Sequence, residues 1–138
     1  MRTMLERLLV AAGLFVAANF CLSYIIPAPV GDPGWLIFPF GRADATTTWT
    51  FGHLDGFGLV LMLGLAGFAV LAFIGAFLAT FGVWVASDLW RPLVLLGTAC
   101  SALLFVLHLG PWAIVPLVLD GVLFWVAWTS AWSPAVTA

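Results

Sequence analysis

The chain has 138 residues, of which 64% are hydrophobic and only 7% are charged, and its formal net charge is -2. A typical soluble domain carries about 25% charged residues, so this chain cannot build an ordinary water-exposed surface. It also has no lysine and no basic patch, which excludes nucleic acid as a partner. We therefore expect an integral membrane protein whose surface contacts the lipid bilayer.

Four apolar stretches follow one another along the chain. They cover about residues 5–26, 57–85, 92–109 and 111–132. About 20 apolar residues are enough for a helix to cross the roughly 30 Å of hydrocarbon in a bilayer. The predicted fold is an all-α bundle of four transmembrane helices, forming one domain over residues 1–138, with one long outer loop at 27–56 between the first two helices.

The long loop contains a strongly apolar segment. Its large side chains are Trp35, Leu36, Ile37, Phe38 and Phe40. A loop of about 30 residues is too short to build a core of its own, so this segment needs another surface. Packing on its own helices and contact with a partner subunit are equally open.

Four arginines indicate the orientation. Arg2, Arg7 and Arg91 fall on one side of the predicted membrane, and Arg42 falls on the other. Because cytoplasmic segments are enriched in Lys and Arg, both termini are expected in the cytoplasm. The predicted location is a bacterial inner membrane.

Asp120 lies inside the fourth apolar stretch, IVPLVLDGVLFWVAW. A carboxyl group at that depth is costly, and such residues usually face a partner or a wet cavity. One interpretation is a proton or quinone site formed with His108. A second is a position in a transport pathway. The third is a structural bond to a neighbouring helix, or to the carbonyl of Trp112, which Pro116 leaves without its helical partner.

His108 and His53 are the candidate cofactor ligands. Both are expected near the outer interface, at the end of the third helix and just before the second. Imidazole suits a haem iron or a chlorophyll-type magnesium, and a quinone at an interface is a further candidate. A lone histidine more often makes an ordinary hydrogen bond. The chain has no Cys/His cluster, so no structural metal site is predicted.

Small and polar residues inside the stretches are expected to mediate helix packing. Asn19 is the only amide in the first stretch, and Cys21 and Cys100 are expected to be small buried residues. The second stretch is rich in small residues whose spacing lets helix backbones approach closely. They are Gly64, Gly67, Ala72, Gly75, Ala76 and Ala79.

No nucleotide-binding or hydrolase motif is present, so no enzymatic activity is predicted. The predicted function is that of an accessory or structural subunit among other integral membrane subunits. Its expected host is a respiratory or photosynthetic electron-transfer complex. The alternatives are a small redox protein that binds a cofactor or quinone through His108, His53 and Asp120, and a small homo-oligomeric transporter with Asp120 in its pathway.

Overall fold

The computed structural model describes residues 3–22, 49–50, 56–109 and 113–134. The elements of these residues are, in chain order, α1 (Met4–Leu22), β1 (Trp49–Thr50), α2 (Gly56–Phe81), the 3-10 helix η1 (Ser87–Leu89), α3 (Trp90–Leu107), β2 (His108–Leu109) and α4 (Ile114–Trp128). The all-helical bundle predicted from the sequence is confirmed in these four α-helices. The two short strands were not predicted.

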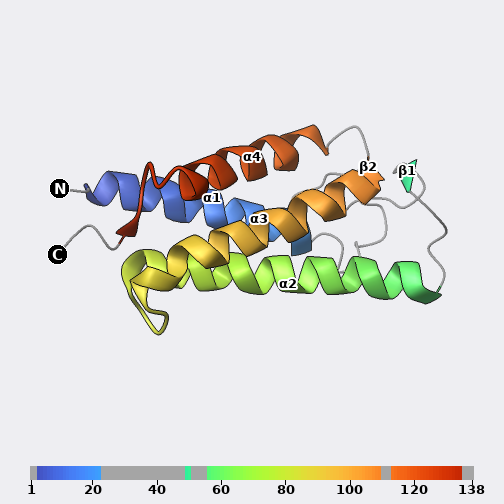
Figure 1. Cartoon of the computed structure of the whole chain (residues 1–138), viewed down its shortest axis with the longest axis horizontal. Coiled ribbons are helices and arrows are strands. Elements are labelled where there is room, and N and C mark those ends of the chain that lie inside the picture. Colours follow the sequence, from blue (N-terminus) through green and yellow to red (C-terminus); the bar gives the residue numbers. More distant parts are fainter. Residues whose placement is uncertain (1–2, 23–48, 51–55, 110–112, 135–138) are drawn as a thin grey trace, which may run out of the picture.

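The helices lie side by side along the long axis of the molecule (Figure 1). α1 packs on α2, α2 on α3 and α3 on α4, whereas α1 and α4 touch much less. The start of α1, the turn from α2 to α3 and the end of α4 lie at one end of the bundle (Figure 1). At the other end, β1 and β2 pair antiparallel, with Trp49 opposite Leu109 and Thr50 opposite His108.

Among the described residues, three helices are long and apolar enough to cross a membrane: α1, α2 and α3. The sequence predicted four such helices. α4 has 15 residues, which corresponds to about 22 Å at 1.5 Å per residue and is less than the roughly 30 Å of hydrocarbon. It begins at Ile114, so Pro116 lies in its first turn, where a proline is tolerated and does not bend the helix.

α2 ends at Phe81, four residues earlier than the sequence predicted, because Gly82 adopts a left-handed conformation with φ of 65°. The amide of Val83 donates to the carbonyl of Leu78, and the amide of Gly82 donates to that of Ala79. This pair of bonds is the Schellman arrangement that closes many helices. α4 ends similarly, with Ser130 at φ of 54° and the amide of Ala131 bonded to the carbonyl of Val126.

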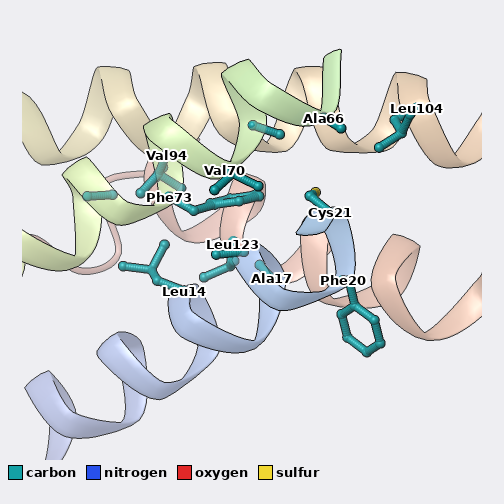
Figure 2. Close-up of a cluster of buried hydrophobic side chains, with 14 of the residues drawn as sticks. Leu14, Ala17, Phe20, Cys21, Ala66, Val70, Phe73, Val94, Leu104 and Leu123 are labelled. Atoms are coloured by element: carbon teal, nitrogen blue, oxygen red, sulfur yellow. The ribbon is translucent and has the colours of Figure 1, made fainter. Parts of the chain in front are cut away.

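The core draws side chains from all four helices. Leu14 of α1, Phe73 of α2, Val94 of α3 and Leu123 of α4 belong to one buried cluster (Figure 2). Large apolar side chains are also exposed on the outside of every helix. Examples are Leu9 at 64%, Leu71 at 69% and Val118 at 60% exposed. Water does not favour such a surface, whereas hydrocarbon does.

Two arginines and two tryptophans stabilise one end of the bundle, the end at which the α2–α3 turn lies. Arg7 donates to the carbonyl of Thr80, and Arg91 donates to the carbonyl of Trp128, so each cation meets the carbonyl end of a neighbouring helix. Trp90 and Trp132 are buried edge to face, with ring centroids 5.1 Å apart. This contact folds the chain after α4 back onto the start of α3.

Candidate functional site

Asp120 lies in the middle of α4 and points into the bundle, where only 3% of it is exposed. The hydroxyl of Ser101, on α3, donates to its Oδ2 across 2.6 Å. This distance is at the short end of the range for a hydrogen bond between two oxygens. The carboxyl group is therefore fixed to the neighbouring helix.

Cys21 extends this contact to a third helix. Its Sγ donates to the Oγ of Ser101 across 3.4 Å, and both side chains are buried. A hydroxyl accepts one hydrogen bond while it donates another, so the donors run in one direction, from Cys21 on α1 through Ser101 on α3 to Asp120 on α4. We call these three residues the polar relay.

A partly open cavity of about 270 Å³ adjoins the polar relay between α3 and α4. Most of its wall is apolar, and Asp120 is the one ionisable group in that wall. The lining residues are Thr98, Ala99, Ala102, Leu117, Asp120, Gly121 and Phe124. A cavity with apolar walls and few polar groups is the usual form of a small-molecule site, although this one is just below the common range of about 300–1,000 Å³.

No cation faces Asp120 among the residues that the structure describes; its interaction there is the Ser101 hydrogen bond. The two arginines of the described chain, Arg7 and Arg91, are bonded at the end of the bundle instead. Chemically, the site offers a carboxyl group with one oxygen engaged, next to an apolar space. It is suited to hydrogen bonding with a ligand or to holding a proton.

Three other buried polar residues hydrogen-bond within their own helices. Asn19 donates to the carbonyl of Phe15, Thr80 to that of Ala76 and Thr98 to that of Val94, each four residues earlier. Within the described residues, the hydrogen bonds of Asn19 do not join the polar relay. Ser101 is a site residue that the sequence alone does not reveal. It is one of several small polar residues in the apolar stretches, and only its placement opposite both Asp120 and Cys21 distinguishes it.

The small residues of α2 divide into two groups. Ala72, Ala76 and Ala79 are buried, and a Cβ added to Gly75 would lie 3.2 Å from Leu93 of α3. By contrast, a Cβ added to Gly64 or Gly67 would meet nothing within 4 Å in the described chain. Of the glycines in the described chain, Gly97 of α3 has the least space, because an added Cβ would lie 2.9 Å from Phe73 of α2. Sequence reasoning examined α2 for this pattern and overlooked α3.

Several predicted site residues lie outside the described part of the chain. These are His53, the apolar loop residues Trp35, Leu36, Ile37, Phe38 and Phe40, and also Trp112, whose carbonyl was a predicted partner of Asp120. For His108 the structure describes only the backbone, in β2. Across the described residues, no group of three His, Cys, Asp or Glu side chains is placed to hold a metal ion.

Comparison with known proteins gives no relative. No protein-family model, curated protein or solved structure matches the chain.

Proposed function

We propose that the protein is an integral membrane protein and an accessory or structural subunit of a larger membrane complex. Large apolar side chains cover the outer surface of every helix, while the polar side chains of Ser101 and Asp120 are buried and hydrogen-bonded between two helices. Buried hydrogen bonds and small residues hold helices together in lipid, where the hydrophobic effect between helices is lost. This distribution supports a bilayer as the surroundings of the bundle.

The subunit role is supported mainly by the exposed apolar face of α4. Seven large apolar residues of this 15-residue helix are exposed: Ile114, Val115, Val118, Val122, Phe124, Trp125 and Trp128. α4 packs mainly on α3 and makes little contact with α1, so one flank lacks a neighbour among the described residues. Exposed aromatic residues on a short and half-packed helix suit an interface with another membrane subunit. A respiratory or photosynthetic electron-transfer complex is the host we propose, by association with assemblies that collect small helical subunits.

Purification from native membranes in a mild detergent, followed by mass spectrometry, tests the subunit role. We expect larger membrane subunits at a constant ratio to this chain, and loss of the chain should reduce the yield of the intact assembly. Val118→Ser combined with Val122→Ser should weaken the association if α4 docks, whereas serine at Leu71 and Ile74 of α2 is the matched control. Recovery of the chain alone, or only as a homo-oligomer, would contradict the proposal.

The apolar loop segment is a second docking candidate of the same proposal. Replacing Trp35, Leu36 and Phe38 with serine should release the protein from the assembly if this segment contacts a partner. Unchanged association would leave the α4 face as the docking surface and remove the loop from the interface.

The placement of the arginines supports cytoplasmic termini. Arg7 and Arg91 lie at the same end of the bundle, as do the start of α1 and the end of α4 (Figure 1). Because positive residues are retained on the cytoplasmic side, we assign this end to the cytoplasm of a bacterial inner membrane. A green fluorescent protein fused to the C-terminus should fluoresce, and an alkaline phosphatase fused there should be inactive; the opposite pair of results would reverse the orientation.

A further inference from the structure

The cavity between α3 and α4 differs from the rest of the helix packing because the buried acidic residue Asp120 lies in its wall. Seven residues line it, four from α4 and three from α3. Asp120 is in this wall and Ser101 holds its Oδ2, so Oδ1 is the carboxyl oxygen that a bound molecule would use. An acidic residue at such depth usually has a functional partner.

The wall restricts the chemistry of that molecule. Ala99, Ala102, Leu117 and Phe124 present hydrocarbon, and the side chain of Phe124 stacks on Trp128 with ring centroids 5.7 Å apart. A ligand that enters from the surrounding hydrocarbon must itself have an apolar body. It also needs one group that can bond to Asp120. A hydroxyl meets that need whether the carboxyl group is ionised or protonated, because a hydroxyl both donates and accepts.

We propose that the α3–α4 cavity binds a membrane-soluble alcohol or phenol, with its hydrocarbon body along Ala99, Ala102 and Phe124 and its hydroxyl group bonded to Asp120. Ser101 and Cys21 are positioning residues in this site, because Ser101 fixes the carboxyl group and Cys21 orients the hydroxyl of Ser101. The site belongs to this chain alone and does not depend on the proposed role in a larger complex.

The test uses the purified full-length protein in phosphatidylcholine nanodiscs. The probe is a long-chain primary alcohol that carries a photoreactive diazirine in its chain, and the control probe is the same hydrocarbon without the hydroxyl. We expect saturable labelling of peptides from α3 and α4, stronger for the alcohol by about fivefold, the ratio that a hydrogen bond of ordinary strength contributes. Equal labelling by both probes would overturn the hydroxyl recognition.

Two glycines supply a matched pair of variants. Gly121 lines the cavity and Gly64 lies on α2, and an added Cβ meets no described atom within 4 Å at either position. Gly121→Leu should fill the cavity and remove most labelling by the alcohol, whereas Gly64→Leu should leave it unchanged. Equal labelling of Gly121→Leu and Gly64→Leu would overturn the site.

Variants of Asp120 test the polar contact. Asp120→Leu should abolish the preference for the alcohol over the hydrocarbon, and Asp120→Asn, which still hydrogen-bonds, should keep at least part of it. A full preference in Asp120→Leu would overturn the role of the carboxyl group. If Asp120→Leu does not fold, the Asn variant and the pair of glycine variants still decide the result. These measurements need no partner subunit, so failure of the accessory role would leave them unaffected.

Discussion

α3 packs mainly on two helices, α2 and α4, and these two interfaces are built differently. Against α2 it packs without room to spare: a Cβ at Gly97 would lie 2.9 Å from the Phe73 ring and 3.3 Å from Ala72. Against α4 it is joined by the hydrogen bond from Ser101 to Asp120, and a cavity of about 270 Å³ lies beside that bond. The first interface is closely packed, whereas the second combines a buried hydrogen bond with open space beside it.

This difference indicates that the α2–α3 interface stabilises the bundle, whereas the α3–α4 interface forms the candidate site. Close packing of small and aromatic residues gives van der Waals contact over a large area and leaves no space for a ligand. A polar contact beside a cavity fixes a functional group and leaves space next to it. We therefore expect substitutions at the α2–α3 interface to change stability and substitutions beside the cavity to change binding.

Gly97→Leu should have the largest effect on stability. Its side chain would collide with Phe73 and Ala72 and force α2 and α3 apart, and overpacking of this kind costs about 1–3 kcal/mol. Titration of sodium dodecyl sulfate into dodecylphosphocholine micelles, followed by circular dichroism, measures the free energy of unfolding. Gly64→Leu is the control, and an equal effect of both substitutions would show that α2 and α3 are not closely packed at Gly97.

Ser101→Ala should have a moderate effect, because it removes the donor to Asp120 and leaves a buried carboxyl oxygen without it. Hydrogen bonds between membrane helices contribute about 0.6 kcal/mol on average, and up to about 1.7 kcal/mol. We expect a loss of about 1 kcal/mol in the same titration. A double-mutant cycle with Asp120→Leu, which removes the acceptor, isolates the coupling, and additive effects of the two substitutions would contradict a direct bond.

The sequence predicted the helical bundle well and the site only in part. Apolar stretches of spanning length identify helices because hydrocarbon forces each backbone to satisfy its own hydrogen bonds. The ends of the helices were less predictable. α2 ends where Gly82 adopts a left-handed conformation, but the sequence stays apolar as far as Val85 and does not show this end. Asp120 was recognisable as a candidate site residue because a carboxyl group inside an apolar run is energetically costly.

The partners of Asp120 were not recognisable from the sequence. Ser101 and Cys21 lie 19 and 99 residues away along the chain, and nothing in their local sequence shows which way their helices face. Gly97 was overlooked for a related reason. A single glycine in a helix shows its role only when the neighbouring helix is in place, and here that neighbour is the ring of Phe73.

Gly121→Ala should have the smallest effect on stability, and this makes it the sharpest comparison with Gly97. Both glycines lie inside a helix, so the intrinsic gain in helix propensity on replacement by alanine is the same at both positions. They differ in their surroundings: in the described chain nothing lies within 4 Å of a Cβ at Gly121, whereas Phe73 obstructs one at Gly97. Gly121→Ala should therefore shift the free energy of unfolding by less than about 1 kcal/mol and towards greater stability, while Gly97→Ala shifts it the other way. A loss of stability in Gly121→Ala would mean that the space beside Asp120 is already filled by packing, and the contrast between the two faces of α3 would then disappear.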